Sequence, residues 1–305
     1  MRVFVTGASG HIGSALIPEL LQNGHQVIGL ARSDQSAAVL AAAGAEAYRG
    51  HLDDLDGLRE AAAASDGVVH LAFKHEEMRS GDYLTAIADD LKAIEAMGAG
   101  LEGSGKPFVG TGGTLLLAFS GITGRAGTED DVLAGGPRVD AENTVTGLAQ
   151  RGVRSSLLRL SPLVHSSLDH HGFAHGLIGI ARGTGVSGYV GDGANRWPAV
   201  HTLDAARLYR LALESAPAGS RLHGVADEGV PFKDIAEVIG RRLDLPVKSI
   251  DEQDVAGQFS YLANFVGLDN WTSSGRTRQL LGWEPTHAGL LDDLTHGHYF
   301  DEPAA

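Results

Sequence analysis

The sequence predicts an α/β protein, with a Rossmann-type, doubly wound parallel sheet and a smaller C-terminal lobe. Short apolar runs alternate with helical patterns through the first 160 residues, and such alternation is typical of a parallel sheet covered by helices on both faces. A glycine-rich turn separates the first strand from the first helix, as in open sheets that bind ligands at their strand ends. The 305 residues suffice for one large core and a second, smaller lobe.

The first strand ends at Thr6, and the first helix covers 11–22, where apolar side chains recur on one face. Pro18 within it predicts a kink, and Gly24 predicts a C-terminal cap. The later elements follow at similar spacing. Strands are expected over 27–31, 45–48, 67–72, 107–111 and 154–160, and helices over 37–43, 55–64, 83–101 and 139–150.

Three glycines, Gly7, Gly10 and Gly13, join the first strand to the first helix in a Gly-x-x-Gly-x-x-Gly pattern. Glycines let the backbone approach phosphates closely, and the start of the helix presents N–H groups to them. The spacing differs from the older Gly-x-Gly-x-x-Gly fingerprint, but a turn that binds nothing would not need three glycines. The loop therefore predicts a site for the pyrophosphate of a dinucleotide.

The alternation ends after Ser161, where glycine, histidine and serine become dense. Helices dominate the remainder, with expected helices at 203–214 and 232–242. Segments 183–190 and 221–225 are typical of strands, and one or both should return to the main sheet. The expected division gives 1–160 to the dinucleotide-binding core, with 200–228 returning to it, and gives 161–199 and 229–305 to the smaller, substrate-binding lobe.

Composition restricts the partners. The net charge of −14 argues against nucleic acid or an anionic membrane, so a small-molecule substrate is expected. The chain has no cysteine, which excludes disulfides and thiol-based metal or redox chemistry. We find no signal peptide and no apolar run approaching about 20 residues, so a cytoplasmic location is expected.

The loop from Thr6 to Gly13 resembles that of the short-chain dehydrogenase/reductase superfamily, in its extended or atypical branch. Four later segments resemble family landmarks in the same order, and the resemblance covers about residues 1–225. They are Leu52-Asp53, an adenine-contacting pair; His70-Leu71-Ala72, the turn that passes the cofactor; Arg159-Leu160-Ser161-Pro162, which borders the nicotinamide; and Val200-His201-Thr202-Leu203-Asp204, which opens a late helix in sugar epimerases.

The resemblance implies a nicotinamide dinucleotide held along the carboxyl ends of the strands. The residues that it assigns to the cofactor are Gly7, Ser9, Gly10, His11, Ile12, Gly13, Arg32, Ser33, Leu52, Asp53, Leu71, Ala72, Phe73, Thr111, Pro162 and Leu163. It also implies a homodimer as one arrangement, through helices 83–101 and 139–150.

The end of the second strand favours NADP over NAD. NAD-binding relatives usually place an acid there, and this chain has Ala31 followed by Arg32 and Ser33. An arginine at this position can pair with a 2′-phosphate and stack on adenine. Asp34 is expected to cap the next helix.

The catalytic signature of the resembling family is missing. Its enzymes use a tyrosine, a lysine four residues later, and a serine or threonine after the fifth strand. These positions fall on Arg138, Glu142 and Gly113, with Thr114 adjacent, and the sequence holds no Tyr-x-x-x-Lys. A guanidinium is not a general acid near neutral pH, so Arg138 cannot act as the tyrosine does. Arg138 and Glu142 are at helical spacing and are expected to form an exposed ion pair.

Three residues are the first candidates for the proton donor: Thr114, His75 beyond the fourth strand, and His165, the first of four histidines between 165 and 175. The other three of these histidines and the tyrosines Tyr83 and Tyr189 are further candidates. No metal is expected, because the histidines at 170, 171 and 175 lack firm ligand spacing.

Two residues are candidates for substrate contacts. Arg196 would clamp a carboxylate or phosphate, and Trp197 would wall an apolar ring. The alternative places Trp197 in the lobe interior and Arg196 in solvent. His201 and Asp204 are expected to cap and brace the late helix.

The sequence therefore favours an NADP-dependent oxidoreductase that acts on a small carbonyl- or alcohol-type substrate with a non-standard proton donor. Hydride transfer is cofactor chemistry, and the protein positions and polarises the carbonyl group. One alternative is a non-catalytic NADP-binding redox sensor, which the missing tyrosine and lysine favour. A nucleotide-sugar epimerase is the weaker alternative, because it would need the same tyrosine.

Overall fold

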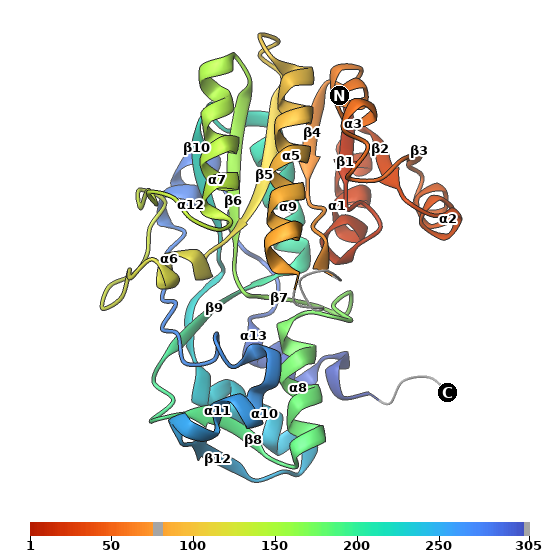
Figure 1. The fold of residues 1–305 in the computed structure, drawn as a ribbon. Coiled ribbons are helices and arrows are strands. Elements are labelled where there is room, and N and C mark those ends of the chain that lie inside the picture. Colours follow the sequence, from red (N-terminus) through yellow and green to blue (C-terminus); the bar gives the residue numbers. More distant parts are fainter. Residues whose placement is uncertain (76–81, 302–305) are drawn as a thin grey trace.

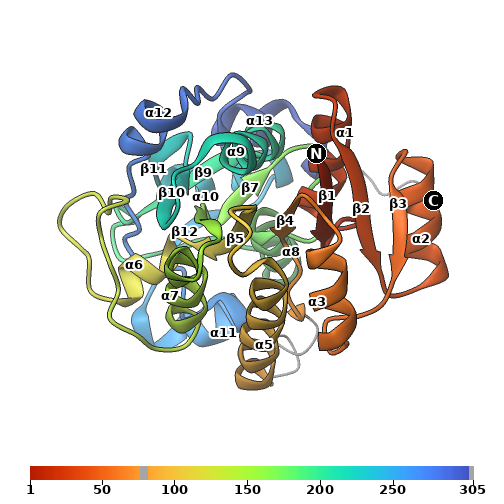
Figure 2. The same cartoon turned by 90° about the horizontal axis from the view of Figure 1, so that it is seen from above.

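The main sheet contains seven parallel strands in the order β10-β6-β5-β4-β1-β2-β3 (Figures 1 and 2). The structure is a computed structural model, and it describes residues 1–75 and 82–301. The strand order reverses between β1 and β4, so a crevice for ligands is expected where these two strands end. The strands are β1 (Arg2–Thr6), β2 (Gln26–Ala31), β3 (Glu46–Arg49), β4 (Gly67–His70), β5 (Pro107–Gly113), β6 (Arg154–Leu160) and β10 (Ser220–Gly224).

Helices cover both faces of this sheet. One face carries α3 (Leu55–Ala63), α5 (Tyr83–Leu101) and α7 (Val139–Gly147), and the other carries α1 (His11–Gln22) and α9 (Thr202–Ser215) (Figure 2). Two shorter helices lie at the margins: α2 (Asp34–Ala42) packs on β2 and β3, and α12 (Gly275–Leu281) packs on β10 and α9.

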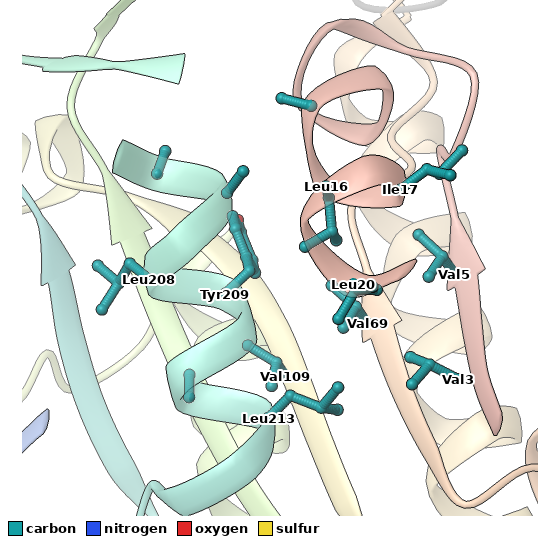
Figure 3. Close-up of a cluster of buried hydrophobic side chains, with 14 of the residues drawn as sticks. Val3, Val5, Leu16, Ile17, Leu20, Val69, Val109, Leu208, Tyr209 and Leu213 are labelled. Carbon is teal, nitrogen blue, oxygen red and sulfur yellow. The ribbon is translucent and has the colours of Figure 1, made fainter. Parts of the chain in front are cut away.

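The two cores follow from the alternation of side chains along each strand. Val3 and Val5 point toward α1 and α9, where they join the cluster in Figure 3, and Phe4 between them points to the opposite core. All three are fully buried. A strand with both faces buried reads as a continuous apolar run, which is the signal that the sequence carries here.

The smaller lobe follows β6 and lies below the carboxyl ends of the main strands (Figure 1). Its core surrounds Trp197, which is fully buried. It holds a three-stranded sheet of β7 (Leu163–His165), β9 (Arg196–His201) and β11 (Asp227–Pro231), and a pair formed by β8 (Ser187–Val190) and β12 (Val247–Ile250). Its helices are α8 (Phe173–Thr184), α10 (Phe232–Leu243), α11 (Val255–Phe259) and α13 (Leu290–His296).

The predicted α/β architecture is confirmed, with several local differences. Segment 221–225 returns to the main sheet as β10, whereas the segment around β8 pairs with β12 instead. The cap of α2 is Ser33 and not Asp34, because the Ser33 hydroxyl accepts from the Ser36 N–H in a capping box. The predicted helix 139–150 ends as a 3-10 helix over Leu148–Arg151, and the short helix α6 (Leu115–Phe119) has no counterpart in the prediction.

Among the described helices, none combines the length and apolar character that a bilayer crossing requires.

Strand β10 is tied to the C-terminal segment by His223, which is fully buried. Its backbone N–H donates to the Thr277 hydroxyl at 2.8 Å, and its Nδ1 lies 2.8 Å from the Ser273 carbonyl oxygen. Burial lowers the pKa of His223 to about 4, although the charge of Glu129 opposes the shift. The folded state therefore requires a neutral imidazole here.

We expect stability to fall when the pH decreases from about 6.5 to about 4. The unfolded chain takes up a proton at His223 below about pH 6.5, and the folded chain does so only near 4, so acid favours unfolding. The loss is about 2 kcal/mol between pH 6.5 and 5. Urea unfolding at pH 7 and pH 5 measures it, and His223→Gln should lose less than the native chain. Equal losses in both proteins would contradict the assignment.

Candidate nucleotide-binding and active site

The glycine loop after β1 lies directly against the turn after β4. Gly7 has a φ of +67°, and a Cβ added there would lie 2.8 Å from the backbone nitrogen of Ala72. A Cβ added at Gly13 would overlap the carbonyl oxygens of Gly7 and Ala8. Gly10 is the N-cap of α1 and offers no side-chain hydrogen bond to its first turn. The loop therefore forms a backbone cradle at a helix N-terminus, which fits a pyrophosphate.

His11, the first residue of α1, connects this loop to the smaller lobe. Its Nε2 lies 2.7 Å from the Thr202 hydroxyl oxygen. That hydroxyl donates to the His165 carbonyl and accepts from Ser166, so the His11 ring is the donor in its own contact. The helix α9, which begins at Thr202, is thereby joined to the cofactor loop.

The segments predicted to hold the adenosine end lie at the carboxyl ends of β2 and β3. Ala31 is fully buried, and Arg32 after it is exposed. Ala31 pairs in register with Arg49, so this edge of the sheet carries two arginines. The Arg49 guanidinium forms an ion pair at 3.0 Å with Asp34.

Asp53, predicted to contact adenine, accepts from Lys74 at 2.6 Å. Lys74 also donates to Asp89 at 2.6 Å, and hydrogen bonds to these two carboxylates raise the pKa of Lys74 to about 12. Leu52 beside Asp53 is half-buried and packs against the core beneath α3. The pair thus lies at the rim of the strand ends, fixed by an ion pair that the sequence did not predict.

A line of buried polar groups runs from the glycine loop to Arg138. The Thr6 hydroxyl accepts from the Ala72 N–H at 3.2 Å and lies 2.6 Å from Nδ1 of His70. Nε2 of His70 lies 3.0 Å from Asp90, whose other oxygen is 3.6 Å from Arg138. An ionised Asp90 only accepts, so Nε2 of His70 carries the proton and Thr6 donates to Nδ1.

Arg138 and Glu142 do not form the exposed ion pair expected from their spacing. The Arg138 guanidinium lies over the Phe73 ring, 4.1 Å from its centroid, and pairs with Asp90. Glu142 is buried and accepts from the fully buried Arg159 at 3.0 Å. Burial raises the pKa of the Glu142 carboxyl, and the Arg159 charge opposes this. The expectation fails because Arg138 is the N-cap of α7 with a φ of +65°, so its side chain leaves the helical path.

The three candidate proton donors lie in different environments. Thr114 is fully buried and accepts from the Asn270 amide at 2.9 Å. His165 is also fully buried, with Nδ1 2.8 Å from Asp293. Neither exposes an atom to a ligand in this conformation. His75 is exposed, and its ring meets the edge of Phe73 at 5.3 Å between centroids, so it lies beside the ring that Arg138 covers.

The remaining residues predicted along the cofactor surround this line. The Thr111 hydroxyl donates to the His70 carbonyl at 2.7 Å and contacts the Tyr209 hydroxyl at 2.8 Å. Pro162 is half-buried, and Leu163 is buried in the core of the smaller lobe. Leu163 thus has little surface left for a nicotinamide ring.

The two predicted substrate contacts are engaged within the protein. Arg196 donates to both oxygens of Asp269, at 3.0 and 2.6 Å, and lies over the Trp271 ring at 4.3 Å. Trp197 is fully buried in the lobe core, so it cannot wall an open substrate site. The alternative reading of Trp197 as an interior residue agrees with the structure, and Arg196 serves as an internal clamp.

His201 and Asp204 brace the late helix as expected. Nδ1 of His201 accepts from the Leu203 N–H at 3.2 Å, which caps α9. Asp204 accepts from the backbone N–H groups of Thr286 and His287, both at 3.0 Å. Burial lowers the pKa of His201 to about 4, which keeps the cap neutral.

Histidines that are far apart in the sequence meet at the start of α8. No metal was expected because His170 and His175 alone lack firm ligand spacing. The structure adds His298, and one ligand nitrogen from each of the three lies within 4.8 Å of the others. No local pattern predicts this third residue, because more than 120 positions separate it from the other two.

Comparison with known proteins agrees with this geometry. Residues 3–94 match the NAD dependent epimerase/dehydratase family. An uncharacterized protein of Schizosaccharomyces pombe is 46% identical over 302 residues, covering 98% of this chain and 100% of that protein. A sterol-4-alpha-carboxylate 3-dehydrogenase (decarboxylating) of Dictyostelium discoideum is 28% identical, covering 76% of this chain and 73% of that one.

A solved structure also shares the fold. The dTDP-glucose 4,6-dehydratase DesIV from Streptomyces venezuelae, with NAD and TYD bound, superposes with a TM-score of 0.74 at 19% identity. The match covers 97% of this chain and 95% of that one.

Gly13→Ala should weaken dinucleotide binding, because its methyl group would overlap two backbone carbonyls of the cradle. We expect the affinity to fall at least about tenfold, the equivalent of a 1.4 kcal/mol loss. Gly179→Ala is the matched control, since Gly179 is exposed on α8 with open space around it, and alanine there should stabilise the helix by about 0.5–1 kcal/mol. Fluorescence titration with the reduced cofactor and thermal melting measure both. Unchanged binding by the Gly13 variant would show that the loop does not hold the nucleotide.

Proposed function

Because the chain belongs to the NAD-dependent epimerase/dehydratase family of the extended short-chain dehydrogenases/reductases, and is thus an NAD(P)-dependent oxidoreductase, we propose that it uses NADP(H) to interconvert a small carbonyl compound and its alcohol. The observation that carries the proposal is the arrangement at the carboxyl end of β4. There Arg138 covers the face of Phe73, and His75 meets its edge.

The cradle supports cofactor binding by its shape. Glycine at positions 7 and 13 leaves backbone where a Cβ would collide, as a pyrophosphate site requires. When bound, the cofactor supplies or accepts the hydride. Residues of the loop, the turn after β4 and Thr111 would hold its two halves.

NADP, rather than the NAD named for DesIV, is favoured by charge. The usual acid at the end of β2 is replaced by Ala31, and the exposed Arg32 follows it. Arg49 ends the adjacent strand β3 in register. Two guanidinium groups at one edge suit a 2′-phosphate better than two ribose hydroxyls.

Arg138 is proposed to stabilise negative charge on the substrate oxygen. Its backbone has a φ of +65°, a conformation that costs a non-glycine residue of order 1–3 kcal/mol and is often kept at functional sites. Asp90 holds the Arg138 guanidinium by an ion pair, and the Phe73 ring packs against the face of the guanidinium. A preorganised cation favours the oxyanion that forms as hydride reaches the carbonyl carbon.

His75 is proposed to give that oxygen its proton. In the reduction, the hydride forms the new C–H bond, the carbonyl electron pair moves to oxygen, and the imidazolium proton of His75 completes the alcohol. Solvent then restores the proton, because His75 is exposed. Of the three predicted donors it alone combines exposure with a place beside Arg138, among the described residues.

A non-catalytic NADP sensor is the second candidate. The buried Glu142–Arg159 pair favours it, because Glu142 stands where family enzymes keep the lysine that contacts the cofactor ribose. Tight NADPH binding without turnover of any substrate would support the sensor and contradict the reductase.

Arg32→Asp should reverse the cofactor preference. Removal of a charge-assisted contact worth about 1.5–3 kcal/mol weakens NADPH binding about 10- to 100-fold, and the new carboxylate improves NADH binding. Fluorescence titrations of both cofactors measure this. Arg182→Asp, an exposed change on α8, is the matched control and should leave both affinities unchanged. Tighter binding of NADH than NADPH by the native chain would refute the choice of NADP.

His75→Gln should lower kcat about 10²- to 10⁴-fold, the usual contribution of a general acid, and should leave the NADPH dissociation constant unchanged. NADPH oxidation across a panel of ketones and aldehydes supplies the assay, and the pH–rate profile of the variant should lose the limb that depends on this histidine. His296→Gln, an exposed histidine on α13, serves as control. A full rate in His75→Gln would remove His75 from the mechanism.

A further inference from the structure

We propose that His170, His175 and His298 form a binding site for one divalent transition-metal ion of the zinc class, which fastens the C-terminal turn to the start of α8. Their ligand nitrogens lie within 4.8 Å of one another. The ring centroids are 5.7–6.3 Å apart, so the three rings form one cluster.

Two ring nitrogens of these histidines, Nε2 of His175 and Nδ1 of His298, are buried and have no hydrogen-bond partner in the described part of the chain. A buried polar atom without a partner is unfavourable, and such atoms are few in native proteins. A metal ion coordinated by both nitrogens would remove that cost.

The ring of His298 is already oriented for coordination. Its Nε2 lies 3.0 Å from the carbonyl oxygen of Asp169, which only accepts, so Nε2 carries the proton. Nδ1 therefore keeps its lone pair, which is available to an ion. A second ring nitrogen that donates to a carbonyl is the usual arrangement for a metal-binding histidine.

Asp169 holds the surrounding backbone without acting as a ligand. Its fully buried carboxylate accepts from the N–H groups of His171 and Gly172 at 3.2 and 2.7 Å, and from the Tyr299 hydroxyl at 3.1 Å. These bonds fix the loop before α8 and the turn that carries His298. The three imidazoles therefore come from segments that are held together before any ion binds.

The three imidazole nitrogens determine which metal ions the site favours. Imidazole suits Zn²⁺, Cu²⁺ and Ni²⁺, whereas Mg²⁺ and Ca²⁺ require oxygen ligands. Nitrogens around a tetrahedral Zn²⁺ at 2.0–2.1 Å lie about 3.3 Å apart, so each atom must move by less than about 1 Å. His170 is exposed and makes this adjustment most easily, and water completes the fourth position.

The test titrates chelator-treated full-length protein with ZnCl₂ by calorimetry. We expect one Zn²⁺ per chain with a dissociation constant of micromolar or below, and a melting temperature that rises with Zn²⁺ and returns with EDTA. His170→Gln should weaken binding at least tenfold. It keeps the fold, because His170 is exposed.

His171→Gln is the matched control, since this exposed neighbour lies outside the cluster. It should bind Zn²⁺ as the native chain does. Co²⁺ in place of Zn²⁺ should give the visible absorption of a tetrahedral nitrogen site in the native chain and in His171→Gln, and not in His170→Gln. No zinc binding, or binding that His170→Gln leaves intact, would overturn the proposal. Neither readout depends on turnover, so the result is independent of the proposed reaction.

Discussion

The rest of the site depends on one close approach, in which the backbone of the glycine loop packs directly against the backbone of the turn after β4. No side chain fits at Gly7 or Gly13, so β1, α1 and β4 are held at distances that only glycine permits. Thr6 can then accept from Ala72 across the gap and orient His70. The polar line that ends at Arg138 begins with this contact.

Glu142 and Arg159 form a buried ion pair in which each charge depends on the other. The Glu142 carboxylate lies 2.9 Å from the Arg159 guanidinium, and both side chains are buried. A lysine at 142 would bring a second cation against that arginine, which a low-dielectric interior would penalise strongly. Arg159 and Glu142 therefore require one another.

The sequence predicted the parts of the fold that local patterns encode. The apolar run in β1, the glycines after it and the alternation through residue 160 each report on neighbours in the chain, and the structure confirms the architecture that they predict. Ser33 shows the limit of such patterns. Ser33 and Asp34 are both good caps, and only the backbone geometry decides that Ser33 acts.

The predictions for individual site residues were wrong where contacts between distant parts of the chain determine the position of a side chain. Arg138 and Glu142 match a helical ion pair by spacing, but buried partners from other elements, Asp90 and Arg159, separate them. The sequence around Trp197 is equally compatible with a tryptophan that contacts substrate and one that lies in the lobe core. Only the packing of the lobe decides for the core. His298 carried no signal, because a metal cluster of this kind is formed by contacts across more than 120 residues.

The same segment that carries the histidine cluster also reaches the cofactor loop. Asp169 holds the loop before α8 and, through Tyr299, the C-terminal turn, and its carboxylate lies 3.9 Å from the ring of His11. His11 in turn contacts Thr202, the first residue of α9. One fully buried carboxylate, that of Asp169, therefore lies next to the loop before α8, the C-terminal turn and the first residue of α1. The contact between Asp169 and His11 is the longest of these, so the histidine cluster and the glycine loop meet at Asp169 without sharing a short hydrogen bond.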